Sequence, residues 1–135
     1  MKILVINGHP DKESYCQAIF QTIVNNIDAT HHEFEVINLN EEDFDPVLRY
    51  GYRKRMEEDS FILRSQELIQ WADHFIFVYP IWWSSMPSLM KGWIDRVFTP
   101  GIAYSANDQG SFIWNYLRGK QFKKLLKGKT ASIYA

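Results

Sequence analysis

The sequence has little of what marks secreted, membrane or nucleic-acid-binding proteins. It contains one cysteine, Cys16, so no disulfide can form within the chain, and a cytoplasmic location is expected. The longest apolar run, FIFVYPIWW, is short and contains a proline, so membrane insertion is not expected. The N-terminal MKILVINGHP does not have the pattern of a signal peptide. A formal net charge of −1 gives no field that would attract nucleic acid.

The composition is that of one globular domain. A chain of 135 residues with 46% hydrophobic content can form a single core, so residues 1–135 are interpreted as one domain. Aromatic residues make up 16% of the chain, which is more than a small core needs. Part of this surplus is expected to line a pocket for a flat ligand, although ordinary core packing is the more frequent use of such residues.

Short apolar segments alternate with segments of helical periodicity. The apolar segments predict four strands, at residues 2–7, 32–39, 74–80 and 130–135. The first helix is predicted to follow Ser14, because Ser14 and Gln17 have capping-box spacing and Ala18, Ile19, Ile23 and Ile27 recur at helical intervals. Further helices are predicted at 58–72 and 86–98, the latter with Pro87 in its first turn. The intervening segments are interpreted as loops at 40–57 and 99–110, and as mixed with helical potential at 111–129.

This order of strands and helices predicts an α/β protein with an open, doubly wound parallel sheet. In such sheets ligands bind beyond the carboxyl ends of the strands. The loops at 8–14 and 80–86 are therefore predicted to form the ligand-binding site.

The loop 8–14, GHPDKES, leads directly into a predicted helix. The N-terminus of a helix offers unpaired N–H donors that suit phosphate, and Ser14 and His9 could add donors of their own. The loop matches neither the G-x-G-x-x-G pattern nor the P-loop pattern. The alternative is that Ser14 only caps the helix and His9 is a solvated loop residue.

The stretch PIWWSSMP places two adjacent tryptophans after the most apolar strand. The backbone N–H groups of Trp82, Trp83 and Ser84 could face the edge of a planar heterocycle, with an indole beside its face. The equally weighted alternative is that both tryptophans pack in the core against the third helix.

The remaining candidates are weaker. Cys16 lies near a helix N-terminus, where the dipole could lower its pKa, but without a partner cysteine a plain helical role is favoured. The pair His31 and His32 lacks the partners of a metal site, so no metal is expected. The basic run from Arg118 to Lys129 is interpreted as a solvated face rather than a phosphate contact.

Three stretches together resemble the flavodoxin-fold NAD(P)H:quinone oxidoreductases, a family that includes bacterial drug-activity modulators and ancillary subunits of potassium efflux systems. The resemblance is carried by KILVINGHPDKESYCQAI, DFDPVLRY and VYPIWWSSMPSLMKGWIDRVFTPGIAY. It implies a flavodoxin-like sheet with strand order 2-1-3-4. Family members continue past the fourth strand with a Gly-Gly loop, a tyrosine and a fifth strand, so the domain is expected to be C-terminally shortened.

The resemblance also implies roles for individual residues. It places two groups at a bound FAD, or alternatively FMN: the phosphate-side residues His9, Ser14, Tyr15 and Cys16, and the ring-side residues Pro80, Ile81, Trp82, Trp83 and Ser84. Family members carry asparagine where this chain has Cys16. The resemblance further implies NAD(P)H as co-substrate, a quinone or similar acceptor, and a homodimer that shares its sites.

The implied activity is two-electron hydride transfer through flavin N5, in which both substrates use one face in turn. No catalytic side chain is assigned, because no acid or base is required from this chain. Three alternatives stay open: an ancillary subunit of a potassium efflux transporter, an inactive truncated member of the family, and an electron carrier of flavodoxin type. The last is disfavoured because a threonine-rich phosphate loop is missing.

Overall fold

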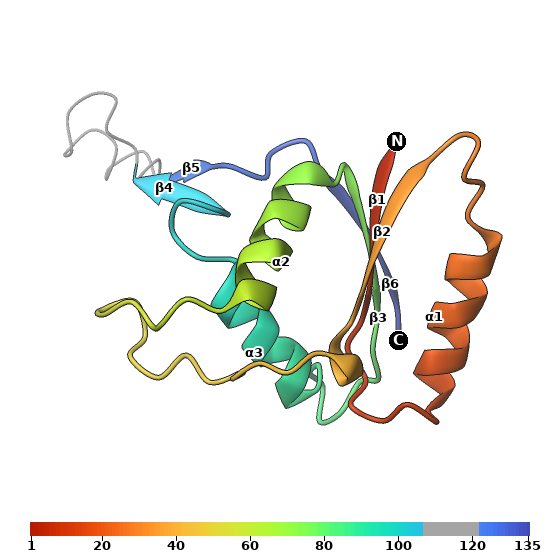
Figure 1. Cartoon of the computed structure of the whole chain (residues 1–135), viewed down its shortest axis with the longest axis horizontal. Helices are drawn as coiled ribbons and strands as arrows, with labels where there is room; N and C mark the ends of the chain where they lie inside the picture. The colour runs from red at the N-terminus through yellow and green to blue at the C-terminus, as the bar shows by residue number, and fades with distance from the viewer. Residues whose placement is uncertain (107–121) are drawn as a thin grey trace.

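The protein forms three layers, a central parallel sheet with helices on both faces (Figure 1). The computed structural model describes residues 1–106 and 122–135. The sheet contains β1 (Lys2–Asn7), β2 (Glu33–Asn38), β3 (His74–Val78) and β6 (Thr130–Tyr134) in the order β2-β1-β3-β6. Helix α1 (Tyr15–Asn26) covers one face, whereas α2 (Ser60–Trp71) and α3 (Ser88–Val97) cover the other. This confirms the predicted α/β class and strand order.

The central strand β1 explains why the sheet is covered on both sides. Ile3 and Val5 face α1 and belong to one hydrophobic cluster, whereas Leu4 and Ile6 belong to the cluster below α2 and α3. β1 pairs in parallel with β2 on one side and β3 on the other. A strand buried on both faces and both edges needs an unbroken apolar sequence, which KILVIN provides.

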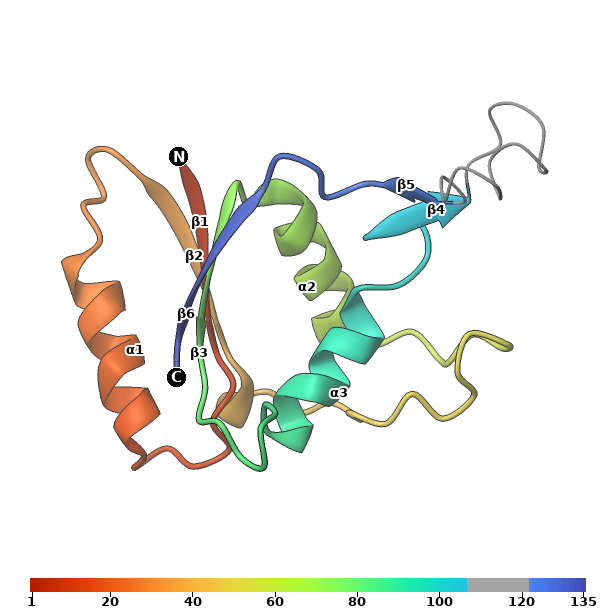
Figure 2. The ribbon, with the colours of Figure 1, turned by 180° about the vertical axis from the view of Figure 1, so that it is seen from behind.

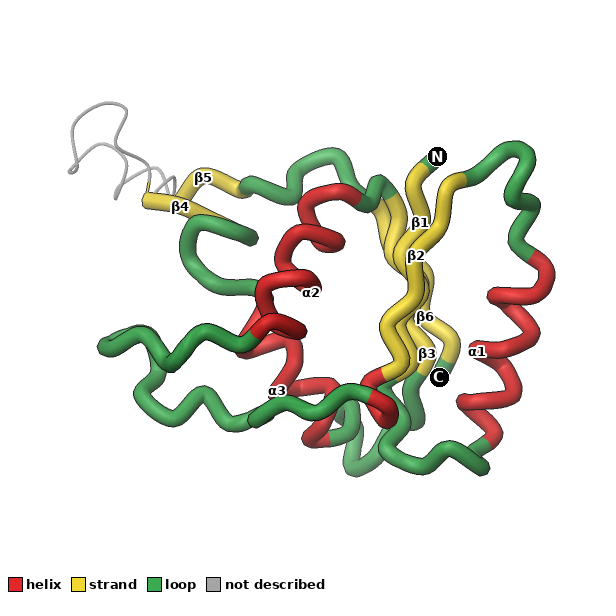
Figure 3. Tube along the Cα trace, viewed as in Figure 1, coloured by secondary structure: helices red, strands yellow, loops and turns green. Residues whose placement is uncertain are grey.

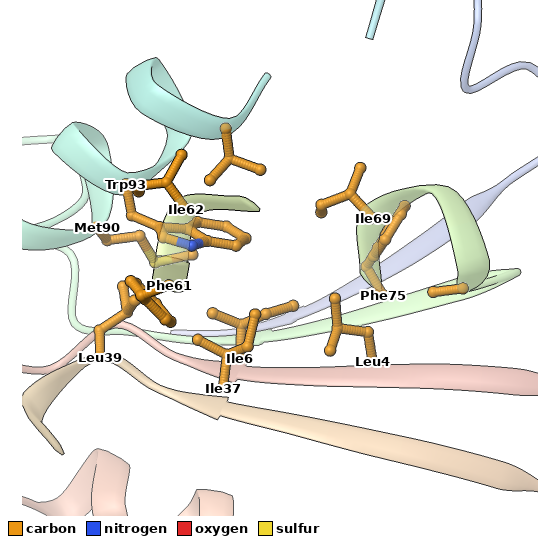
Figure 4. Close-up of a cluster of buried hydrophobic side chains, with 12 residues drawn as sticks. Leu4, Ile6, Ile37, Leu39, Phe61, Ile62, Ile69, Phe75, Met90 and Trp93 are labelled. Carbon is orange, nitrogen blue, oxygen red and sulfur yellow. The ribbon is translucent and has the colours of Figure 1, made fainter. Parts of the chain in front are cut away.

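The larger core cluster lies between the sheet and helices α2 and α3 (Figure 4). Trp93 and Met90 point from α3 toward Phe61 of α2 and Ile6 of the sheet (Figure 4). Trp93 is fully buried, and its indole N–H donates to the Ser65 hydroxyl at 3.1 Å. A buried donor without a partner would cost about 1–3 kcal/mol, so Ser65 is required at this position of α2.

Helix α1 begins as the sequence predicts. Ser14 is its N-cap, and the Ser14 hydroxyl accepts a hydrogen bond from the Gln17 N–H at 3.2 Å. Ile19, Ile23 and Ile27 pack against the sheet as predicted, together with the buried Cys16 and Phe20. Only Ala18, the fourth predicted position, is exposed. At the opposite end of the molecule, Lys129 donates to the Gln70 and Ala72 carbonyls and thereby satisfies the C-terminal end of α2.

The structure differs from the sequence prediction after α3. β4 (Tyr104–Ala106) and β5 (Phe122–Lys124) form a separate antiparallel ribbon that projects away from the sheet (Figure 2). Residues 104–106 were predicted as loop and 122–124 as part of a segment with helical potential. The ribbon is stabilised by edge-to-face packing of Tyr104 and Phe122, a contact between residues too far apart in sequence for local periodicity to indicate. The predicted helical potential of 111–121 lies outside the described residues.

The start of α3 and the segment after β2 also differ from the prediction. Pro87 is the N-cap of α3 and not a residue of its first turn. A short 3-10 helix, η1 (Leu39–Glu41), starts at the last residue of the predicted second strand and overlaps the start of the predicted 40–57 loop. The rest of that loop runs as irregular chain away from the sheet (Figure 3). None of the helices in the described part of the chain is long and apolar enough to cross a membrane.

The long loop is held against α3 at Gly92. A Cβ atom at this position would lie 2.3 Å from the Pro46 carbonyl oxygen. One turn further along α3, the Arg96 guanidinium donates to the Asp45 carbonyl, so the loop cannot easily move away. Glycine is therefore required here by close approach of two backbones.

We expect Gly92→Ala to lower the free energy of unfolding by about 1–3 kcal/mol, because the added methyl group overpacks the contact with Pro46. Urea denaturation measures the change. Lys91→Ala is the matched control, since it removes only an exposed ion pair with Asp95. Equal stability of the two variants would contradict this account of Gly92.

Candidate functional site

The loops that follow β1 and β3 meet at the carboxyl edge of the sheet (Figure 2). The ring of His9, from the first loop, packs edge-on against the Trp82 indole, from the second, with ring centroids 5.4 Å apart. The Gly8 N–H donates to the Val78 carbonyl at 2.8 Å, which joins the starts of the two loops. The two predicted loops therefore form one continuous surface.

The first loop also approaches α3 closely. A Cβ atom on Gly8 would lie 2.2 Å from the Met90 sulfur, so only glycine allows the chain to pass above this helix. Within the loop, the Asp11 N–H donates to the His9 Nδ1 atom at 2.9 Å, and the Glu13 N–H donates to the Asp11 carboxylate at 3.0 Å. These bonds turn the loop so that it enters α1 through Ser14.

The N-terminus of α1 presents backbone N–H donors that are not used within the described residues. Ser14 satisfies the Gln17 N–H, but the N–H groups of Tyr15 and Cys16 have no partner among the described residues. Together with the positive end of the helix dipole, such donors favour an anionic group at this point. Tyr15 itself is largely exposed at the rim of the site.

Cys16 can contribute only its backbone to that arrangement. Its side chain is buried and packs with Phe20, Val5 and Val78 in the cluster between α1 and the sheet. Burial raises the pKa of the Cys16 thiol, whereas the helix dipole alone would lower it. The thiol is thus a small apolar core group, in agreement with the favoured interpretation of Cys16 as a plain helical residue.

The second loop contains a tight turn at the two tryptophans. The Trp82 N–H donates to the Ser85 carbonyl at 2.8 Å, and the Ser85 N–H donates back to the Trp82 carbonyl at 3.0 Å. Trp83 and Ser84 occupy the centre of the turn with φ angles of 51° and 60°. The Trp82 N–H is therefore used inside the turn and does not face a ligand, in contrast to the prediction. The N–H groups of Trp83 and Ser84 have no backbone partner within the described residues.

Both indoles lie at the surface. Trp82 is 46% exposed and Trp83 is 101% exposed, so the alternative of two core tryptophans packed on α3 is wrong. Pro80 is half-buried and Ile81 is exposed on the same loop. A positive φ is strained for a residue as bulky as tryptophan and costs about 1–3 kcal/mol. Such strain is concentrated at functional sites, where the backbone geometry serves a ligand.

The other candidates from the sequence lie elsewhere. His31 precedes β2 and pairs with Asp28, and the described residues contain no group of three potential metal ligands. In the basic run, Lys123 and Lys124 are exposed, whereas Arg118 and Lys120 lie outside the described residues.

A pocket of about 490 Å³ lies between the 48–59 loop, the start of α2 and the end of α3, and it includes neither site loop.

Sequence reasoning missed four amide side chains that lie beneath the first loop: Asn7, Gln17, Asn38 and Asn40. Asn7 is fully buried, although it ends an apolar strand. The available signal was the asparagine at the end of each of the first two predicted strands, which the topology brings together at one edge.

Comparison with known proteins agrees with this architecture. A family described as having the flavodoxin-like fold matches residues 1–134, and the chain belongs to that family. A crystal structure of Smu.1420 from Streptococcus mutans UA159 superimposes with a TM-score of 0.77 at 34% identity, over 98% of this chain and 66% of that one.

Two curated relatives carry names that state an activity. A ribosyldihydronicotinamide dehydrogenase [quinone] of Mus musculus is 27% identical over 98% of this chain and 66% of its own length. An FMN-dependent NADH:quinone oxidoreductase of Geobacillus kaustophilus is 30% identical over 81% of this chain and 61% of its own length. The chain spans about half to two-thirds of the length of the curated relatives that it matches.

We expect the Cys16 thiol to react slowly with a thiol reagent such as DTNB in the native protein and rapidly in urea. Burial both blocks access to the sulfur and raises its pKa, so little thiolate is present at neutral pH. The release of the chromophore measures the rate. A native rate equal to the rate in urea would contradict the buried position of Cys16.

We expect Ser84→Gly to raise the free energy of unfolding by about 1 kcal/mol, because glycine adopts a positive φ without strain. Ser85→Gly is the matched control: Ser85 does not have a positive φ, so glycine there brings no such relief. Thermal unfolding of both variants measures the difference. A Ser84→Gly protein no more stable than Ser85→Gly would show that the turn is not strained.

Proposed function

We propose that the protein is a flavin-dependent NAD(P)H:quinone oxidoreductase. The observation that carries this proposal is the meeting of the open N-terminus of α1 with the strained Trp82–Ser85 turn, through the contact of His9 and Trp82. One loop offers donors for a phosphate, and the other offers donors and indole surface for a flat ring. The names of the mouse and Geobacillus relatives support the same activity.

The residues present fit a flavin nucleotide. The phosphate would be held by the Tyr15 and Cys16 N–H groups and by the Ser14 hydroxyl, which can donate outward while its oxygen accepts from Gln17. Because the N–H of residue 16 is used, the loss of the family asparagine at Cys16 does not remove this donor. His9 lies between the phosphate side and the ring side of the site.

The ring side of the flavin would lie along Pro80, Ile81, Trp82, Trp83 and Ser84. The N–H groups of Trp83 and Ser84 would donate to the polar edge of the ring, and Trp82 would form a wall beside it. When bound, the flavin supplies the chemistry, accepting a hydride from NAD(P)H at N5 and passing two electrons to a quinone.

The chain itself contributes binding, orientation and electrostatics. N–H donors at the ring edge stabilise negative charge there, and the fixed turn places them before the reaction begins. We propose that nicotinamide and quinone use the same open side in turn, which requires one to leave before the other enters. No side-chain acid or base is needed for this sequence of events.

The choice of flavin and the oligomeric state belong to the proposal on separate grounds. FMN is supported by the name of the Geobacillus relative, whereas FAD is the expectation from the family resemblance. A homodimer that shares its sites and a cytoplasmic location belong to the proposal on the same resemblance. The alternative of an ancillary or inactive protein would be favoured by flavin binding without turnover.

We expect the purified chain, after addition of FMN or FAD, to retain flavin through gel filtration and to show its visible absorption bands. It should then oxidise NADH or NADPH in the presence of a quinone. Trp82→Ala should lower flavin affinity by about tenfold, since it removes the wall beside the ring.

Trp71→Phe is the matched control, because Trp71 ends α2 just before the amino end of β3, whereas both site loops lie at the carboxyl edge of the sheet. It should leave flavin affinity unchanged. Failure of the wild-type chain to bind either flavin at high concentration would refute the proposed function.

A further inference from the structure

The four amide side chains beneath the first loop form one hydrogen-bonded group, here called the amide cluster: Asn7, Gln17, Asn38 and Asn40. The Asn7 Nδ2 atom donates to Gln17 Oε1 at 2.7 Å and to Asn38 Oδ1 at 2.9 Å. The Asn40 Nδ2 atom donates to the same Gln17 oxygen at 3.2 Å. The cluster thus joins the ends of β1 and β2 with η1 and the first turn of α1, and Gln17 Oε1 is its shared acceptor.

The cluster also fixes the backbone of His9. The His9 N–H donates to Asn7 Oδ1, and the His9 carbonyl accepts from Asn40 Nδ2, both at 3.1 Å. Side chains therefore hold both polar groups of this one residue. Since His9 packs on Trp82 and accepts from the Asp11 N–H, the cluster controls the loop at the point where both halves of the site meet.

Stability alone does not explain this arrangement. Asn7 is the last residue of the apolar strand β1, and Asn38 lies on the same side of β2 as Phe34 and Val36. Apolar residues would therefore bury well at both positions. The Asn40 Oδ1 atom is buried without a partner within the described residues, which is unfavourable for folding. A polar group that lowers stability but fixes a loop is characteristic of a functional site.

We propose that the amide cluster positions loop 8–14 for a phosphomonoester, and that Gln17 must be neutral because it lies in the same first turn of α1 as the phosphate donors Tyr15 and Cys16. This inference rests on the proposed function. An amide can donate, as Asn7 and Asn40 do here, and can also accept, as Asn7 does, whereas an ionised carboxylate only accepts. Amides also place no negative charge near an incoming phosphate. Gln17, Asn7 and Asn40 are positioning residues, since they act through the backbone of His9 and the first turn of α1.

The test is Gln17→Glu, with FMN and riboflavin as the two probes. The glutamate oxygen still accepts from Asn7 and Asn40, and an acidic residue in the first turn suits the helix dipole, so the protein should fold at least as stably as wild type. The added charge should weaken FMN binding by about tenfold. Riboflavin has the same ring but no phosphate, so its affinity should not change.

Gln21→Glu, one turn further along the exposed side of α1, is the matched control and should leave both affinities unchanged. Asn40→Ala is the second variant: it frees the His9 carbonyl without adding charge, and should weaken FMN more than riboflavin. Fluorescence titration measures all affinities, and urea denaturation measures folding.

The outcomes separate the two proposals. Wild-type protein that binds neither FMN nor riboflavin would overturn the proposed function and this inference with it. Wild-type protein that binds FMN, together with a Gln17→Glu protein that binds it equally well, would overturn this inference alone. Equal losses for FMN and riboflavin in both cluster variants would likewise overturn it, because the cluster would then act only on general folding.

Discussion

The position of β1 between β2 and β3 is the constraint on which the rest of the structure depends. All three strands run in parallel and in tight register, so the chain leaves each of them at the same edge. Everything that a ligand would meet follows one of these strands: the first loop and α1 after β1, η1 after β2, and the tryptophan turn after β3. The position of this six-residue apolar strand thus determines where the site lies, whichever side chains the loops carry.

Much of the fold could be predicted from the sequence because local signals were strong. KILVIN and HFIFVYP are too apolar for surface strands, and Ser14 with Gln17 marked the start of α1 correctly. The β4–β5 ribbon escaped prediction, since its stability comes from pairing between Tyr104 and Phe122, which are distant in sequence. Periodicity reports which face a segment buries, but it does not report a partner elsewhere in the chain.

The candidate site was predictable in outline and not in detail. The two loops could be placed by topology, but the use of the Trp82 N–H inside its own turn depends on the backbone angles of Trp83 and Ser84. Likewise, the sequence left the role of Cys16 open until burial of its side chain separated the thiol from the N–H group. The amide cluster was missed because its bonds join residues up to 31 positions apart, although the asparagines at the ends of the first two strands were a signal for it.

Three tryptophans of the described residues, Trp82, Trp83 and Trp93, lie in two different optical environments. Trp93 is sealed in the core with its indole bonded to Ser65, whereas Trp83 is surrounded by solvent and Trp82 is half-exposed beside His9. Emission from the buried indole reports the integrity of the α/β packing, and emission from the exposed pair reports events at the carboxyl edge. The chain therefore carries separate intrinsic reporters for loss of its core and for occupancy of its surface.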